Sequence, residues 1–282
     1  MTGVMAGGHL SIRMGYESAA KTAARMGMGA FQYFPKNPRS LRVKAFDPRD
    51  AAACLAFCRE KGIVSVAHAP YPVNPAADPA VAEASVRCVL NDLAVAEACG
   101  SIGVVVHFGA WRGSDPLQGY RNVIAWLDRM LEQWPGRARL LLENEAGDRG
   151  PFGTTPEELA KIRALCRRPE AVGFCLDICH LFASGEWNGR NGDEFARRAR
   201  ESGYFAALAA VHCNDSPHPC GSRRDRHAPA GDGRIGEEGF RDLLRLPEIR
   251  RTALLLETPS PEGHPYAGQL NRLRRWCEEE RD

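Results

Sequence analysis

Side chains that can bind metal ions recur at one kind of position in this sequence. Five histidines and four acidic residues each end a short apolar run, follow one closely, or lie in one long polar segment. They are His68, His107, Glu143, Asp177, His180, His212, Asp225, His227 and Glu257. Imidazole nitrogen and carboxylate oxygen form a donor set that suits zinc or manganese. The absence of cysteine from this set argues against an iron–sulfur cluster or a structural zinc site built from thiolates.

These groups carry too much charge to share a small, partly dry site without compensation. Divalent cations provide that compensation. Nine ligands exceed what one tetrahedral zinc can use. Two or three ions fit better, particularly if one carboxylate bridges two of them. Spacing alone would place Asp177 and His180, which are three residues apart, on the same ion. A lone histidine is more often structural than a ligand, so the joint pattern carries the prediction.

Short apolar runs alternate with longer stretches of helical pattern along the whole chain. The runs are residues 7–12, 30–34, 65–69, 103–108, 140–145, 172–178, 206–212 and 252–258. Several are apolar on both alternating faces, as expected for parallel strands that are covered on both sides. Eight such units predict an α/β fold, a closed (β/α)₈ barrel. The alternative, an open doubly wound sheet, is less favoured because no glycine-rich phosphate motif follows the first run.

Two of the intervening stretches have clear helix ends. Residues 79–100 have helical spacing, and Gly100 is placed as a C-terminal cap. Residues 155–168 begin with Thr155 as N-cap and Pro156 at the first helical position. No linker or low-complexity stretch divides the chain, so we expect one catalytic domain over residues 1–282.

A (β/α)₈ barrel brings the C-terminal ends of its strands together at one face, where active sites lie. The predicted ligands end the strands or follow them, so we expect all nine at that face. Two of them, Asp225 and His227, lie in the segment 213–236, which is irregular and rich in Gly, Pro and charged residues. Irregular segments of this length within a compact domain are usually functional.

Composition leaves several classes of protein open and excludes others. The 282 residues include 37 basic and 35 acidic side chains, so a net charge of +2 does not by itself indicate nucleic-acid binding. Ten cysteines without a C-x-x-C pair suggest reduced, buried thiols. We find no signal peptide and no apolar run of about 18 residues, so we expect a cytoplasmic protein without membrane association.

Several longer motifs resemble those of the endonuclease IV family, abasic-site endonucleases of the xylose isomerase-like barrel superfamily. The most specific are LENEAG (142–147), GFCLDICHLFASG (173–185), VHCNDS (211–216), GSRRDRH (221–227) and LLLETP (254–259). Weaker matches are FPKNPRS (34–40) and HAPY (68–71). The resemblance extends along nearly the whole chain.

The resemblance implies three zinc ions, with manganese possible at some sites. The first would be held by His68, His107 and Glu143. Glu143 would bridge to the second, which Asp177, His212 and Glu257 also hold. The third would be held by His180, Asp225 and His227, so the family pattern separates Asp177 from His180. Glu143, Glu257 and His180 are the implied catalytic residues.

The implied reaction is DNA repair by hydrolysis. A hydroxide that bridges two of the zinc ions attacks the phosphorus on the 5′ side of an abasic nucleotide, leaving a 3′-hydroxyl and a 5′-deoxyribose phosphate. The implied partner is double-stranded DNA containing abasic sites, and the family implies a monomer. Arg39 and Tyr71 match loop residues that enter the duplex, although Tyr71 could instead pack on its own loop. Arg226 could contact a phosphate or offset the nearby acids.

Some residues at the predicted mouth depart from the family pattern. Phe108 follows His107 where proline is usual, and Leu41 stands where an aromatic residue is common. None of the departures affects a predicted ligand, so they bear on lesion preference and on DNA binding. A sugar isomerase or epimerase of the same superfamily is the alternative, and a non-catalytic DNA-binding relative is a third possibility. The sequence Asp225-Arg226-His227 favours the nuclease, because the sugar enzymes need only one or two metals.

Overall fold

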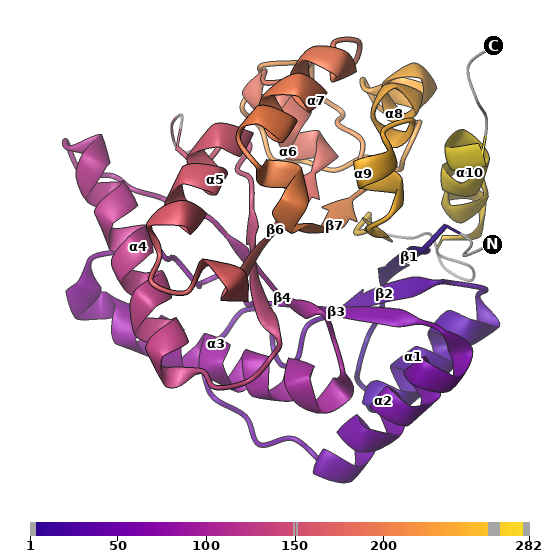
Figure 1. Cartoon of the computed structure of the whole chain (residues 1–282). Coiled ribbons are helices and arrows are strands. Elements are labelled where there is room, and N and C mark those ends of the chain that lie inside the picture. The colour runs from indigo at the N-terminus through magenta and orange to yellow at the C-terminus, as the bar shows by residue number, and fades with distance from the viewer. Residues whose placement is uncertain (1–3, 149, 151, 259–265, 279–282) are drawn as a thin grey trace.

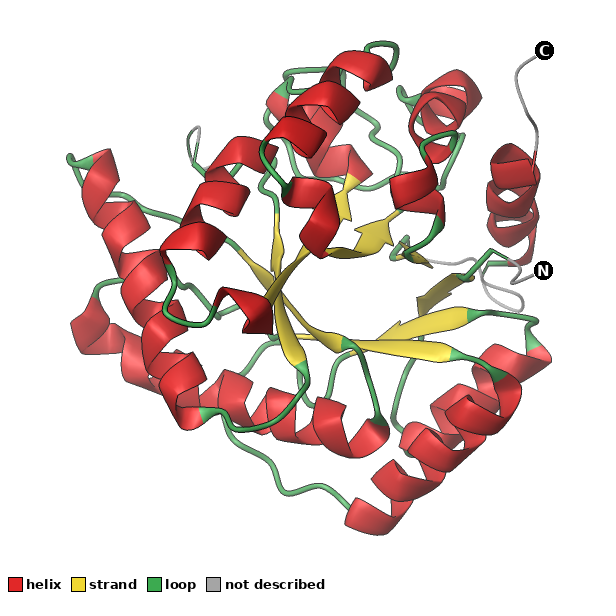
Figure 2. Cartoon of the chain, in the orientation of Figure 1, coloured by secondary structure: helices red, strands yellow, loops and turns green. Residues whose placement is uncertain are grey.

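Eight parallel strands close into a barrel, and helices surround it (Figures 1 and 2). The computed structural model describes residues 4–148, 150, 152–258 and 266–278. The strands are β1 (Ala6–His9), β2 (Ala30–Tyr33), β3 (Val64–His68), β4 (Gly103–His107), β5 (Arg139–Glu143), β6 (Val172–Asp177), β7 (Leu208–His212) and β8 (Ala253–Leu256). Each overlaps one predicted apolar run. The closed barrel is therefore confirmed, and the open sheet is excluded because β1 pairs with β8.

The strands are apolar on both faces because both faces are buried. Val66, Val105 and Leu141 belong to a cluster of fully buried side chains. A second, larger cluster includes Phe31, Val104 and Leu140 and packs against the helices. Because the side chains of a strand point alternately to its two faces, β2 to β8 each contribute to both clusters, whereas β1 contributes Ala6 to the larger one.

The helices lie between successive strands in the chain, apart from α10, which follows β8, and they pack outside the barrel. They are α1 (Tyr16–Arg25), α2 (Pro48–Lys61), α3 (Pro79–Cys99), α4 (Pro116–Gln133), α5 (Pro156–Leu165), α6 (Ile178–Ser184), α7 (Gly192–Glu201), α8 (Gly236–Leu244), α9 (Pro247–Arg250) and α10 (Ala267–Glu278). Short 3₁₀ turns, η1 (Pro169–Ala171) and η2 (Tyr204–Ala207), precede β6 and β7. Among the described residues, every helix is too short or too polar to span a membrane.

The predicted helix ends are largely confirmed. Thr155 forms a capping box with Glu158 at the start of α5, and Gly100 closes α3 in the left-handed conformation, with φ at 70°. The helix predicted over 155–168 ends earlier, at Leu165. The predicted irregular segment 213–236 contains no helix before its last residue, Gly236, where α8 begins, and a single antiparallel bridge joins Asp215 to Ala228.

Candidate metal centre

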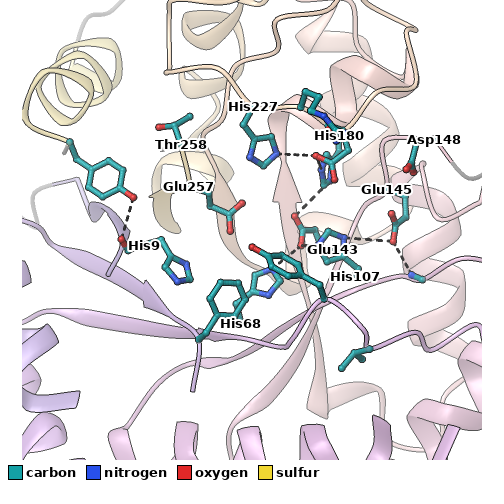
Figure 3. Close-up of a pocket in the computed structure, with 17 residues that line it drawn as sticks. His9, His68, His107, Glu143, Glu145, Asp148, His180, His227, Glu257 and Thr258 are labelled. Carbon is teal, nitrogen blue, oxygen red and sulfur yellow. Dashed lines mark hydrogen bonds and ion pairs between the residues drawn. The ribbon is translucent and has the colours of Figure 1, made fainter. Parts of the chain in front are cut away.

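The C-terminal ends of the strands surround a cavity of about 620 Å³ (Figure 3). His68, His107, Glu143 and His212 are the last residues of β3, β4, β5 and β7. Asp177 ends β6, while Glu257 comes directly after β8. Seven of the nine predicted ligands line the cavity, and the other two, Asp177 and His212, lie fully buried beside them. The structure therefore brings all nine residues to one place.

The first predicted group contains two imidazoles that face one carboxylate oxygen. His68 Nε2 lies 3.5 Å and His107 Nε2 3.6 Å from Glu143 Oε2. Two ligands of a tetrahedral zinc, each at about 2.0–2.1 Å, are separated by about 3.3–3.4 Å. The three side chains are thus spaced as ligands of one small cation.

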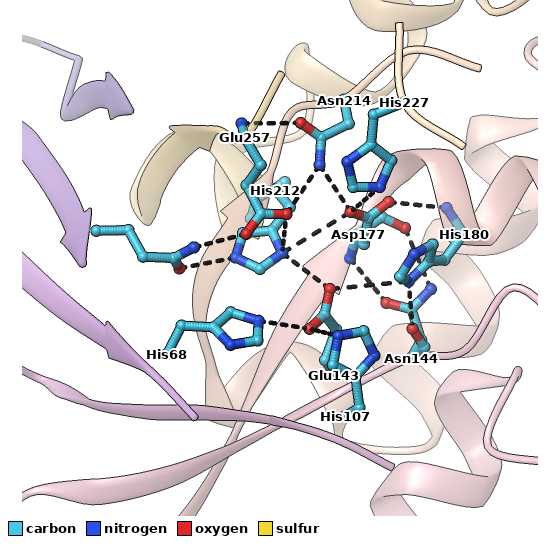
Figure 4. A network of polar contacts seen from close by, with 12 residues as sticks. His68, His107, Glu143, Asn144, Asp177, His180, His212, Asn214, His227 and Glu257 are labelled. Atoms are coloured by element: carbon cyan, nitrogen blue, oxygen red, sulfur yellow. Dashed lines mark hydrogen bonds and ion pairs between the residues drawn. The ribbon is translucent and has the colours of Figure 1, made fainter. Parts of the chain in front are cut away.

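The other oxygen of Glu143 faces the second group (Figure 4). His212 Nδ1 lies 2.9 Å from Glu143 Oε1 and 3.2 Å from Glu257 Oε2. It also lies 3.8 Å from Asp177 Oδ2, and the ligand atoms of all four residues are within 4.8 Å of one another. Glu143 therefore occupies the position that a bridging carboxylate would need.

The third group gathers around Asp225. Its Oδ1 lies 3.2 Å from His180 Nε2 and 3.4 Å from His227 Nε2. Asp177 and His180 belong to different groups, as the family resemblance implies and contrary to what their spacing suggests. Asp177 instead caps α6, where its Oδ1 accepts the backbone N–H of His180 at 2.8 Å.

A thiol also lies within reach of these groups, which the sequence did not predict. The Cys179 sulfur, Asp177 and His227 have potential ligand atoms within 4.8 Å of one another. Burial raises the pKa of Cys179 to about 12. The Cys179 thiol contacts the carbonyl oxygen of Arg226 at 3.3 Å. A neutral thiol engaged in this way is a poor ligand compared with the imidazoles beside it.

Three buried polar atoms at this site have no hydrogen-bond partner among the described residues: Glu143 Oε2, His180 Nε2 and His227 Nε2. Buried polar atoms without a partner are rare and costly, and each of these is a potential ligand atom. One belongs to the first group and two to the third. The residues present therefore fit bound cations.

The pKa values of the buried groups also indicate that the carboxylates require positive charge beside them. Burial alone would lower the pKa of His212, but Glu257 and Glu143 raise it well above its usual range. Burial alone would raise the pKa of Glu143, but His107 and His212 hold it well below its usual range. Protons on the imidazoles thus offset the buried carboxylates. Cations would do so instead, because metal binding displaces protons from its ligands.

The far nitrogen of each fully buried imidazole is held by a second polar group. His68 Nδ1 contacts the carbonyl oxygen of Ala69 at 2.7 Å, and His180 Nδ1 that of Asn144 at 2.8 Å. His212 Nε2 contacts Gln32 Oε1 at 2.9 Å. Such contacts fix which nitrogen is free to bind a metal.

Several of these supporting residues were missed in the sequence. Asn144 and Asn214 lie inside the motifs LENEAG and VHCNDS, but only their acidic and histidine neighbours received roles. Asn214 Nδ2 lies 2.9 Å from Asp177 Oδ2 and 3.1 Å from Glu257 Oε2. Gln32 had a visible signal, since it is the polar residue within the apolar run 30–34.

The residues predicted to touch DNA lie at the rim. Tyr71 is 62% exposed, lines the cavity and packs against Phe34, with the ring centroids 5.3 Å apart. Its backbone N–H donates to Pro38 O at 2.9 Å, which joins its loop to the loop that carries Arg39. Arg226 lines the cavity and is exposed, and Arg39 is also exposed. Their contacts with DNA stay predictions.

Sequence comparison relates the chain to known proteins over nearly its full length. The family described as xylose isomerase-like TIM barrel matches residues 20–279. A protein of Symbiobacterium thermophilum named probable endonuclease 4 is 41% identical over 269 residues, which cover 95% of this chain and 98% of that protein. A protein of the same name from Methanoculleus marisnigri is 37% identical, with 96% and 98% covered.

Structural comparison gives the same result. Endonuclease IV from Thermus thermophilus matches with a TM-score of 0.85 and 33% identity, covering 98% of this chain and 100% of that one. A D-tagatose 3-epimerase-like protein matches with a TM-score of 0.70 at 20% identity, which reflects the shared fold alone.

Proposed function

The chain belongs to the endonuclease IV family of xylose isomerase-like TIM barrels and is thus a DNA repair endonuclease; on this premise we propose that it cuts double-stranded DNA on the 5′ side of abasic sites, using three zinc ions. The products would be a 3′-hydroxyl and a 5′-deoxyribose phosphate. Manganese could replace zinc at some positions, since it accepts the same nitrogen and oxygen donors.

One observation carries this proposal. The nine side chains form three groups with ligand spacing, and Glu143 is shared between two of them. A sugar isomerase or epimerase would use one or two metals and would have no need for the third group around Asp225. The third group and the identity to endonuclease 4 proteins therefore favour the nuclease over the sugar enzyme.

Zinc bound here would make water acidic enough to supply hydroxide near neutral pH, and it would offset negative charge on the phosphate and the departing 3′ oxygen. Glu143 joins the first two groups through its two oxygens and so sets their separation. Burial would raise the pKa of Glu257, but His212 lowers it to about 2, so this carboxylate is ionised at the cavity wall. His180 presents Nε2 to the third group beside Asp225. Hydrolysis then breaks the bond between phosphorus and the 3′ oxygen, without a protein nucleophile.

Recognition of the abasic site belongs to the rim. A missing base lowers the cost of extruding the nucleotide into a cavity. Tyr71 and Arg39, on two joined loops, would enter the duplex, and Arg226 would contact a phosphate beside the third group. We further propose that residues 1–282 form one catalytic domain that acts as a monomer.

Incision of a defined substrate tests this function. The purified chain is incubated with a duplex oligonucleotide that holds one tetrahydrofuran abasic analogue, and bound zinc is measured on the same sample. We expect a cut on the 5′ side of the analogue and close to three zinc ions per chain. Zinc-loaded protein that leaves this duplex intact but converts a ketose would transfer the assignment to the sugar enzymes.

The Glu143→Gln variant tests the shared carboxylate. We expect incision to fall by at least about 10²–10³-fold, because the variant removes one negative charge from two adjoining groups. Glu248→Gln is the matched control, since Glu248 pairs with Arg200 on α7 and does not line the cavity. Incision by Glu143→Gln at the rate of the control would show that the bridging role is wrong.

A further inference from the structure

Gln32 is a fully buried polar residue on β2 that the proposed reaction does not use. Its side-chain amide lies between two predicted ligands of the second group. Gln32 Nε2 donates to Glu257 Oε1 at 2.6 Å, and Gln32 Oε1 lies 2.9 Å from His212 Nε2. Gln32 Nε2 also lies 3.3 Å from His9 Nδ1.

The partners of Gln32 determine which way its amide points. An ionised carboxylate only accepts hydrogen bonds, so the NH₂ group must face Glu257. The amide oxygen then faces His212 and can only accept, so His212 must carry its hydrogen on Nε2. The other nitrogen, Nδ1, can then offer its lone pair to a cation that replaces its proton. That atom faces Glu143 Oε1, Glu257 Oε2 and Asp177 Oδ2.

Gln32 also distinguishes the two oxygens of Glu257. Oε1 is held by the Gln32 amide, whereas Oε2 is turned toward His212 Nδ1. Gln32 therefore holds His212 at Nε2 and Glu257 at Oε1. His212 Nδ1 and Glu257 Oε2 remain turned toward the other members of the second group. One amide thus orients two ligands that come from β7 and from the end of β8.

We propose that Gln32 is a positioning residue for the second metal ion: it fixes His212 as an Nδ1 ligand and Glu257 as an Oε2 ligand. The inference rests on the proposed metal-binding function and adds a residue to it. Residues that hold metal ligands from behind typically contribute about 10- to 100-fold to metal affinity. We expect an effect of that size on one of the three ions.

The test measures zinc affinity by competition with a chelator on the full chain. In Gln32→Leu, one zinc ion should bind about 10- to 100-fold more weakly, while the other ions bind as in the wild type. Tyr33→Phe is the matched control. Tyr33 is the next residue of β2, and its hydroxyl bonds to Ser101 Oγ at 2.9 Å, among side chains that do not line the cavity. The control removes one buried hydrogen bond from the same strand and should keep all its zinc.

A second measurement reports the His212 tautomer directly. Long-range ¹H–¹⁵N spectra of the zinc-loaded wild type should show His212 with hydrogen on Nε2 and metal on Nδ1. Gln32→Glu keeps an acceptor for His212 Nε2 but loses the donor to Glu257 Oε1, so it should retain the His212 tautomer while losing the contact that orients Glu257. Gln32→Leu should lose this tautomer. If Gln32 only stabilised the fold, its substitution would leave the spectrum of the His212 tautomer unchanged.

The outcomes separate this inference from the function on which it rests. Wild-type protein that takes up no zinc would overturn both. Wild-type protein that binds three zinc ions, together with a Gln32→Leu variant of equal affinity, would overturn only the role of Gln32. Hydrogen on Nδ1 of His212 in the loaded wild type would overturn it without any variant.

Discussion

At the residue scale, a buried ion pair holds the loop that carries Arg39. The Lys36 ammonium contacts the Asp92 carboxylate and donates to Cys88 O at 3.0 Å, and both of these partners lie on α3. The two charged side chains are only 3% and 0% exposed. Removing one partner of a buried ion pair leaves an uncompensated charge, which costs about 3–5 kcal/mol. We expect Lys36→Met to lose that much unfolding free energy at neutral pH.

The loss should depend on pH in a defined direction. Burial raises the pKa of Asp92 to about 6, even with Lys36 beside it. An acid with a raised pKa in the folded state stabilises the fold at low pH and loses this contribution as pH rises. Without Lys36 that pKa rises further, so Lys36→Met should be less destabilised near pH 5 than near pH 8. Urea denaturation at both values checks this, and Lys36→Met/Asp92→Leu should recover most of the loss. Equal losses at the two pH values would contradict the account.

Individual residues differed in how far they could be predicted. The convergence of the predicted ligands was predictable because a histidine or acid at the end of an apolar run is unusual and the barrel brings such ends together. Gln32 was not assigned a role, because its partners Glu257 and His212 lie 225 and 180 residues away in the chain. Only the register of β2 against its neighbours determines that they meet.

At the element scale, one carboxylate organises the long segment between β7 and α8. Fully buried Asp215 accepts five backbone N–H groups, at 2.7–3.1 Å, from Ser216, Gly231, Gly233, Ile235 and Gly236. Apart from one bridge, no strand pairing or helix orders this segment. Because the segment carries Asp225 and His227, Asp215 sets the geometry of the third group from outside it.

Asp215→Asn should therefore weaken the third zinc ion selectively. An amide has one accepting oxygen instead of two, so several of the five N–H groups lose their partner. We expect zinc affinity at the third group to fall by about 10- to 100-fold. Amide hydrogen exchange should speed up at Gly231, Gly233 and Gly236. Asp232→Asn is the control, since Asp232 lies in the same segment but pairs with Arg272. Loss of all three ions together would argue for general unfolding instead.

Element boundaries were harder to predict than the elements themselves. The apolar run 172–178 was correctly expected to contain a strand, but α6 begins at Ile178, directly after β6. A buried strand and a short buried helix are both continuously apolar, so periodicity does not separate them. The change occurs at Asp177, whose side chain caps the helix while its position ends the strand.

At the scale of the whole molecule, closure of the barrel brings the predicted ligands together. The nine residues span His68 to Glu257, and they meet because β1 pairs with β8 to complete the barrel. The overall net charge of +2 gave no indication of a DNA substrate, since it averages over the molecule. The indication came from the motifs and the overall identity that the chain shares with endonuclease 4 proteins.

Zinc anomalous scattering from crystals of the zinc-loaded chain tests the central claim most directly. We predict three anomalous peaks in the cavity, with Glu143 between the first two and Asp225 beside the third. Each peak should lie about 2.0–2.2 Å from its ligand atoms. A loaded crystal with no peak in this cavity, or with peaks bound only by other residues, would contradict the account.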